Sequence, residues 1–239
     1  MDDIHVLSSL LPKDDQYITK CNEYMVYIDE HKTKVITAYN MYFKDRLYNI
    51  LSNFMRDITT TECAVYEKML ADAVQNHDMS KYSDAEFNAY RIKYYPTNYE
   101  KELIKENQEK SELVEEMFKD AWRHHYTVNK HHPRFFIWNK ITDDGFKLLQ
   151  EPLQSPQDMD IISIMEMICD WSAMSKEYNY LGWWLNPEES RDEHEEMSYK
   201  TKMTVKLISQ QILPEDCKDV TDDTIWFMDN KVVDKDNGE

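Results

Sequence analysis

The chain has 239 residues, with 28 basic and 46 acidic side chains and a formal net charge of −18. Hydrophobic residues make up 41% and charged residues 31%, the balance of a globular protein of one or two domains rather than a disordered chain. So acidic a surface repels phosphate backbones and argues against binding long DNA or RNA, and only 3 glycines argue against Rossmann and P-loop folds.

The predicted elements are helices, because apolar residues recur at spacings of three and four. The expected spans are about 13–44, 61–76, 83–95, 99–130, 155–178 and 188–213. The third begins at a capping box formed by Ser83 and Glu86, and the fifth at a cap, Ser155, followed by Pro156. Residues 133–152 read as irregular and aromatic. The simplest account is one all-α domain, a helical bundle over residues 1–213, with an acidic C-terminal tail over 214–239.

Cysteine usage and apolar runs bear on the compartment. The 4 cysteines are scattered without a CxxC pair, which favours a reduced setting and excludes a zinc ribbon. The acidic N-terminus does not resemble a signal peptide, and no stretch approaches the ~18 apolar residues of a transmembrane helix. We therefore expect a cytoplasmic protein with no membrane partner.

Several histidines fall where the helical pattern places the core. His31 lies in the apolar stripe of the first expected helix, His77 ends the apolar face of the second, and His125 lies on that of the fourth. Asn129 and His132 follow His125 at four and seven residues, on the same face as far as the helix persists. A single histidine on an apolar face is more often a hydrogen-bonded core residue than a ligand.

Asp170 stands in a helix that is apolar on nearly every side. Ser163, Glu166 and Asp170 form a polar stripe only about 60° wide, at ~100° per residue. The stripe is either the solvent side of this helix or a buried carboxylate face, which needs a partner or a metal. Together with the histidines and Asp78, it offers the imidazole and carboxylate ligands typical of Mn, Fe, Zn or Ni sites.

The order of these residues resembles that of the HD-domain metal-dependent phosphohydrolases. Members of that superfamily are helical bundles in which a histidine, a His-Asp doublet and a distant aspartate converge on a metal. The doublet string, HDMSK over 77–81, is similar to the His-Asp-x-x-Lys form of the binuclear branch, which adds one histidine and then a histidine pair. Matched by order, and taking His132 from the pair for its register with His125, the implied metal ligands are His31, His77, Asp78, His125, His132 and Asp170.

A second resemblance is more specific. The strings HDMSK at 77–81, HHYTVNKHHP at 124–133 and EMICDW at 166–171 are similar to those of an uncharacterised family of phage and bacterial proteins, over about residues 20–212. That family carries no assigned reaction, so the expected chemistry comes from the superfamily and from the residues themselves.

The superfamily resemblance implies hydrolysis of a phosphoester or phosphoanhydride at one or two divalent ions (Mn, Fe, Zn, Ni or Mg). Asp78 and Lys81 are the implied catalytic residues: Asp78 bridges metals or orients the attacking water, and Lys81 stabilises charge on phosphate oxygens. Lys81, Asn129 and Arg134 are the expected substrate contacts. The negative surface favours a small substrate, either a nucleoside phosphate or a cyclic (oligo)nucleotide, in the host cytoplasm if the protein is phage-encoded.

Two other functions remain open from the sequence. One is a non-catalytic module that binds metal and nucleotide without turnover. The other is an acidic interaction protein, a DNA mimic that occupies the basic groove of a host factor, suggested by the net charge of −18 and the acidic run at 188–196. A mimic has no need of histidines on apolar helix faces, whereas a metal site does.

Overall fold

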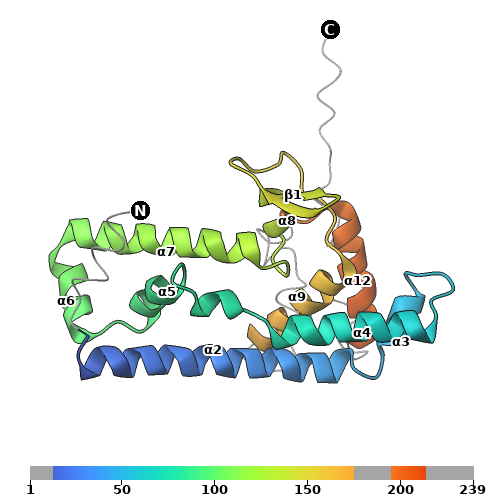
Figure 1. Cartoon of the computed structure of the whole chain (residues 1–239), viewed down its shortest axis with the longest axis horizontal. Helices are drawn as coiled ribbons and strands as arrows, with labels where there is room; N and C mark the ends of the chain where they lie inside the picture. Colours follow the sequence, from blue (N-terminus) through green and yellow to red (C-terminus); the bar gives the residue numbers. More distant parts are fainter. Residues whose placement is uncertain (1–12, 175–194, 214–239) are drawn as a thin grey trace, which may run out of the picture.

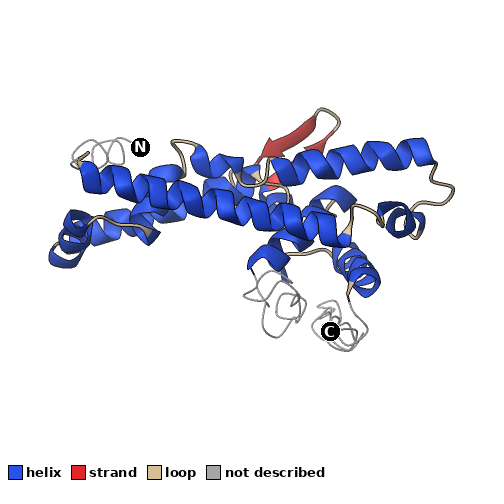
Figure 2. Cartoon of the chain, turned by 90° about the horizontal axis from the view of Figure 1, so that it is seen from below, coloured by secondary structure: helices blue, strands red, loops and turns tan. Residues whose placement is uncertain are grey.

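The computed structural model describes residues 13–174 and 195–213, and the expected tail over 214–239 lies outside them (Figure 1). The described chain is all-α apart from one small hairpin, as expected (Figure 2). None of its helices combines the length and apolar character needed to cross a membrane. In chain order the elements are α2 (Asp15–Tyr42), α3 (Leu47–Ser52), α4 (Thr60–Gln75), η1 (Met79–Tyr82), α5 (Phe87–Tyr94), α6 (Asn98–Glu106), α7 (Gln108–Val128), α8 (Phe135–Trp138), β1 (Asn139–Thr142), β2 (Gly145–Leu148), α9 (Ile161–Met174) and α12 (Tyr199–Ile212).

The long helix α2 organises the fold. Its N-cap is Asp14, whose carboxylate accepts from the backbone N–H of Tyr17, and its bounds confirm the expected 13–44 span to within two residues. Helix α4 begins at a true capping box, in which Thr59 and Glu62 satisfy one another's backbone N–H groups. α2 packs against α4, α5 and α9, while α7 runs along the opposite edge of the view in Figure 1.

The apolar interior has two parts that meet along α2. The larger core is built from the C-terminal half of α2 with α3, α4, α8, α9 and α12. The smaller core lies between the N-terminal half of α2 and helices α5 and α7. On α2, Ile28 belongs to the smaller core and Val35 to the larger, and His31 lies between them on the same buried face. Polar groups from several helices gather at this junction.

Two helix predictions in the middle of the chain are wrong in detail. Ser83 and Glu86 do not form a capping box: α5 begins at Phe87, and Glu86 makes no side-chain cap because its carboxylate contacts His124 and His125 instead. The single helix expected over 99–130 is broken at Asn107, whose extended backbone ends α6 and whose side chain caps α7.

Two later starts also differ from expectation. Helix α9 begins at Ile161 rather than at Ser155, since Asp160 accepts from the backbone and hydroxyl of Ser163. Gln157 is not in a first turn, because its amide donates to the backbone carbonyl oxygens of Phe136 and Asn139. Within residues 195–213, the final helix begins after a Ser198 cap rather than continuing from 188, and 188–194 lie outside the described residues.

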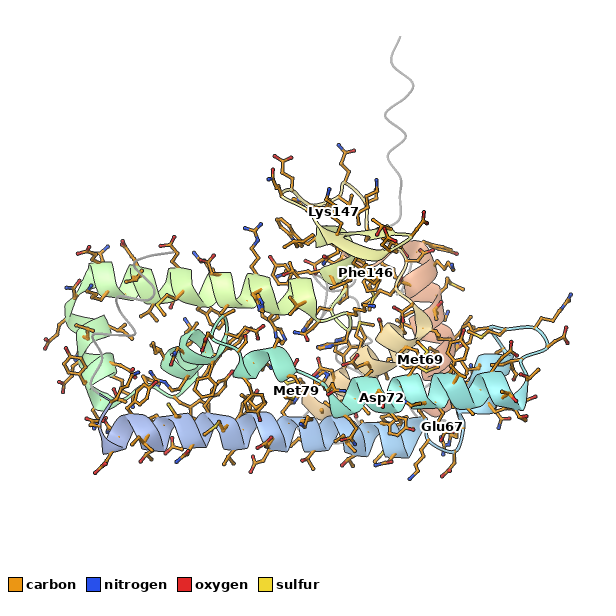
Figure 3. All side chains as sticks on the ribbon, viewed as in Figure 1. Glu67, Met69, Asp72, Met79, Phe146 and Lys147 are labelled. Carbon is orange, nitrogen blue, oxygen red and sulfur yellow. The ribbon has the colours of Figure 1, made fainter. Side chains whose placement is uncertain are left out.

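The segment 133–152 is not irregular, since it forms α8 and the β1–β2 hairpin. The strands pair antiparallel, with Thr142 opposite Gly145, whose φ of +123° is a conformation that favours glycine. Phe146, labelled in Figure 3, packs its ring against Phe135 at 4.8 Å between centroids, and Lys130 lies over the same ring at 4.3 Å. The hairpin therefore fastens the turn on both sides of the His131–His132 pair.

Candidate metal centre

A left-handed residue directs the chain into the site. Helix α4 ends at Gln75, and Asp78 adopts φ 58° and ψ 20° before the 3-10 turn η1 begins at Met79. Aspartate tolerates this backbone conformation better than most residues with a Cβ. The sharp turn leaves His77 and Asp78 buried, with 1% and 2% of their surface exposed, while Met79 lies at the surface beside α2 in Figure 3.

The first set of ligand atoms comes from α2, the His-Asp doublet and α9. The Nε2 atom of His31 lies 3.0 Å from Asp170 Oδ1 and 3.3 Å from His77 Nε2. Asp78 Oδ2 lies 3.6 Å from His77 Nε2 and 3.8 Å from His31 Nε2. Two ligands bound about 2.1 Å from one ion are separated by about 3.0–3.4 Å at octahedral or tetrahedral angles. These four atoms therefore stand close to the spacing of a coordination shell.

The second set uses the other oxygen of the same carboxylate. Asp78 Oδ1 lies 3.3 Å from His125 Nε2, in the last turn of α7, and 3.5 Å from His131 Nε2. His132 completes a group whose candidate ligand atoms all lie within 4.8 Å of one another. Burial lowers the pKa of both His125 and His132, which favours the neutral imidazole, the form that binds a metal.

Unpartnered buried atoms mark this second set. Asp78 Oδ1, His131 Nε2 and His132 Nε2 are buried and have no hydrogen-bond partner among the residues that the structure describes. Buried polar atoms are normally hydrogen-bonded, and three ligand-type atoms without hydrogen bonds in one place are typical of a position that suits a metal ion. The donor chemistry, imidazole nitrogen with carboxylate oxygen, fits Mn, Fe, Zn or Ni.

Two further carboxylates orient the histidines. Glu166 Oε1, on α9, contacts Nδ1 of His77 at 3.0 Å and Nδ1 of His131 at 3.2 Å. Glu86 Oε2 contacts Nδ1 of His125 at 2.9 Å. In each case the carboxylate holds the ring nitrogen that points away from Asp78. Such carboxylate–histidine pairs fix the ring tautomer and raise the basicity of the ligating nitrogen.

The charges of the cluster hold its carboxylates ionised. Burial alone would raise the pKa of Asp78, but the nearby charges of His77 and Lys81 outweigh it and keep this pKa well below the ordinary range. Burial alone would lower the pKa of His77, but Asp78, Asp170 and Glu166 outweigh it and raise that pKa to about 10. The proton that this raised pKa favours on His77, together with the Lys81 ammonium group, offsets part of the carboxylate charge.

The cluster opens into a cavity of about 200 Å³. Its wall includes His31, Asp78, His125, His132 and Asp170, so both sets of ligand atoms reach it. Of the three predicted substrate contacts, Lys81 and Arg134 line this wall and Asn129 is not among its residues.

Lys81 lies in the cavity wall, with Nζ 2.5 Å from Asp78 Oδ2. Arg134 also lines the wall, but its Nε donates to Glu196 at 2.5 Å. Asn129 donates to Ser80 Oγ at 2.7 Å and to the backbone carbonyl oxygen of His125 at 2.8 Å. The amide of Asn129 therefore supports the end of α7 and the 3-10 turn.

All six predicted metal ligands converge in the structure, and the cluster holds three further residues that the sequence pattern does not assign to it. His131 joins the second set beside His132, because the turn after α7 directs both rings inward and helical register no longer applies there. The spacing of Ser83 and Glu86 predicts a capping box, which gives no sign of the contact between Glu86 and His125. The signal for Glu166 is its place one turn before Asp170 on the polar stripe.

Replacing Glu166 with glutamine is expected to weaken metal binding about 10- to 100-fold, because a neutral amide oxygen is a weaker acceptor than a carboxylate and does not raise the basicity of the two imidazoles. Metal affinity is measured by competition with a chelator. The control is Glu116→Gln, an exposed glutamate on α7, which should leave the affinity unchanged. Equal affinities for the two variants would show that Glu166 does not orient the ligands.

Fold and site together define a helical protein with a buried histidine–carboxylate cluster that opens into a cavity. The chain belongs to a family of unknown function (DUF5662), whose model matches residues 20–213. That span contains every residue of the cluster. No curated protein and no solved structure matches the chain.

Proposed function

We propose that this protein is a metal-dependent phosphohydrolase of the HD type that acts on a small cytoplasmic nucleotide. The observation that carries the proposal is the position of Asp78, which presents Oδ2 to one set of imidazole and carboxylate ligands and Oδ1 to another. A carboxylate shared in this way is suited to bridge two ions. The order of His31, the His77–Asp78 doublet and Asp170 along the chain supports the same class.

The residues present fit divalent metal. His31, His77, Asp78 and Asp170 would hold one ion, and Asp78, His125, His131 and His132 a second. When bound, such ions lower the pKa of a coordinated water and neutralise charge on phosphoryl oxygens.

The chain's own groups prepare the site for an anionic substrate. Glu166 and Glu86 fix the orientation of three imidazoles, so little rearrangement is needed at the moment of reaction. Lys81 places a positive charge in the cavity wall, where a phosphate group would meet it. Its ammonium group pairs with Asp78 Oδ2. If that oxygen bound a metal ion, the ammonium group would be free for the substrate.

The test is elemental analysis of the freshly purified full-length protein beside a His77→Ala/Asp78→Ala variant. We expect one or two equivalents of Mn, Fe, Zn or Ni in the wild type and none in the variant. A matched control is Lys44→Ala/Asp45→Ala, an exposed adjacent pair just after α2, which should keep its metal. Wild-type protein is then screened with Mn for phosphate release from nucleotides, and the double variant should release none.

The outcomes separate the alternatives. Metal and nucleotide binding without phosphate release would contradict catalysis and favour a non-catalytic binding module. Absence of metal, together with no uptake on titration, would contradict the metal site itself. It would direct attention to the net charge of −18 and to an acidic interaction protein with a basic host partner.

A further inference from the structure

A second cavity adjoins the metal centre. It measures about 460 Å³, larger than the first, and the two share Tyr27, Lys81, Trp122 and Met174 as wall residues. The two cavities are therefore neighbours that meet at these four side chains. The rest of the described wall is aromatic, consisting of Tyr24, Tyr90, Tyr94 and Tyr95. We call this space the tyrosine pocket.

The rings of the pocket extend directly from the metal ligands. Tyr27 stacks on His31, with centroids 6.4 Å apart and planes 12° apart, and Trp122 stacks on His125 at 5.7 Å and 20°. Tyr95 contacts Tyr27 at 6.1 Å between centroids. Flat apolar faces thus begin beside the metal centre and continue into the pocket, an arrangement suited to a planar ring attached to a phosphate-bearing group.

Two hydroxyl groups on this wall lack partners. Tyr24 and Tyr90 are 1% and 6% exposed, and their hydroxyl oxygens make no hydrogen bond with any residue in the described ranges. A phenol hydroxyl is a hydrogen-bond donor, so each of them can donate to an acceptor atom. Leaving a buried donor unsatisfied is unfavourable, so a small shift of either ring that opened its hydroxyl group to the pocket would let an acceptor atom on a flat ligand ring satisfy it.

The charge on the wall distinguishes between two kinds of ligand that bind aromatic side chains, namely cations and neutral flat rings. Aromatic pockets also bind quaternary ammonium groups, but this described wall holds no carboxylate that would favour a cation, and its one charged residue is Lys81. A neutral heteroaromatic ring with acceptor atoms fits both the stacking surfaces and the unpartnered donors. Pockets of this size ordinarily hold small molecules of nucleoside scale.

We propose that the tyrosine pocket binds the nucleobase of a nucleotide whose phosphate lies at the metal centre. The assignment of the phosphate rests on the proposed function, whereas the pocket for the base stands on its own residues. Base recognition here depends on stacking between aromatic side chains, with hydrogen bonds from Tyr24 and Tyr90.

The test measures binding of ligands that cannot be hydrolysed. Full-length protein, as purified and after chelation, is titrated calorimetrically with adenosine, guanosine, cytidine and uridine, and with ribose as the reference that lacks a base. At least one nucleoside should bind tenfold or more tightly than ribose in both preparations. Tyr94→Leu should weaken that binding about tenfold, since it removes one stacking face. The side chain of Tyr94 is 58% exposed, so the variant is expected to fold.

The control is Tyr99→Leu, a tyrosine of similar exposure on α6 outside the pocket, which should bind as the wild type does. The proposal is overturned if no nucleoside binds more tightly than ribose, if Tyr94→Leu has no effect, or if phosphocholine binds more tightly than every nucleoside. Nucleoside binding without metal uptake would contradict the proposed phosphohydrolase function and still support the base pocket. Metal uptake and phosphate release from ribose 5-phosphate, with no nucleoside bound, would support the phosphohydrolase function and contradict the base pocket.

Discussion

Replacing Asp78 with asparagine is expected to abolish metal binding while leaving the fold intact. The change removes the negative charge that faces His31 and His77 through Oδ2 and His125 through Oδ1. It also sets an amide N–H group against one side of the cluster, where a ligating oxygen is needed. Because the loss affects both sets of ligands, affinity should fall by more than the ~100-fold typical of losing an outer partner. Metal content and chelator competition give the measurement.

The backbone makes asparagine the informative substitution. Asp78 has a φ of 58°, and asparagine adopts this left-handed conformation as readily as aspartate, whereas alanine would add strain. The control is Asp57→Asn, because Asp57 is exposed and is the other described residue besides glycine with a positive φ, at 61°. That variant should keep its metal. Full metal content in Asp78→Asn would refute the shared-carboxylate arrangement.

The second large effect concerns stability rather than the site. Arg91 on α5 is fully buried and is held by Glu100 of α6, with Arg91 Nη1 and Nη2 2.9 and 2.5 Å from the two carboxylate oxygens. Glu100→Ala removes one partner and leaves the guanidinium buried without it. Breaking a buried pair in this way costs about 3–5 kcal/mol of unfolding free energy. Urea unfolding followed by circular dichroism provides the measurement.

The same helix offers a matched control. Lys93 of α5 pairs with Glu115 of α7, but both side chains are partly exposed, and such surface pairs contribute about 0–1 kcal/mol. Glu115→Ala should therefore change the free energy of unfolding far less than Glu100→Ala. Comparable losses for the two variants would show that burial does not strengthen the Arg91–Glu100 pair.

The pair also predicts the direction of a pH effect. Burial alone would raise the pKa of Glu100, but hydrogen bonds from Arg91 and from the backbone of Thr97 outweigh it and lower this pKa below 4.5. Because the folded pKa is the lower one, the contribution of Glu100 is fully present above the unfolded value. It is lost as the pH falls through the folded value. The difference in the free energy of unfolding between the wild type and Glu100→Ala should therefore become smaller as the pH falls below about 4.5.

Periodicity predicted the elements whose signal is local. Helices α2 and α4 bury one face each, and the spacing of their apolar residues, with Asp14 and Thr59 at the caps, is present in the sequence itself. The same logic placed His31 and His77 on buried faces. Their convergence with Asp170 was inferred from a family resemblance, because pattern alone does not say which helix faces lie opposite one another.

The predictions from sequence are wrong where a side chain with a good local helix signal binds a residue distant in the sequence instead. Glu86 has the right spacing for a cap, but two histidines 38 and 39 residues away bind its carboxylate. Gln157 follows a good helix start, yet its amide donates to the backbone carbonyl oxygen of Asn139 and the helix begins only at Ile161. Helical register favours His132 over His131, but the turn after α7, which the hairpin contacts through Phe146, brings both rings to Asp78.

The junction of the two apolar cores has a consequence for cooperativity. The larger core contributes α9 with Asp170, the smaller core contributes α7 with His125, and α2 passes through both. Where two apolar units meet through ionisable groups rather than through packed hydrocarbon, each unit opens locally at a lower free energy than the whole. A ligand that binds groups from both units, and only when they are apposed, links their unfolding into one transition. Ligand binding at the cluster and cooperative unfolding of the bundle are therefore expected to depend on the same few side chains, among them His125 and Asp170.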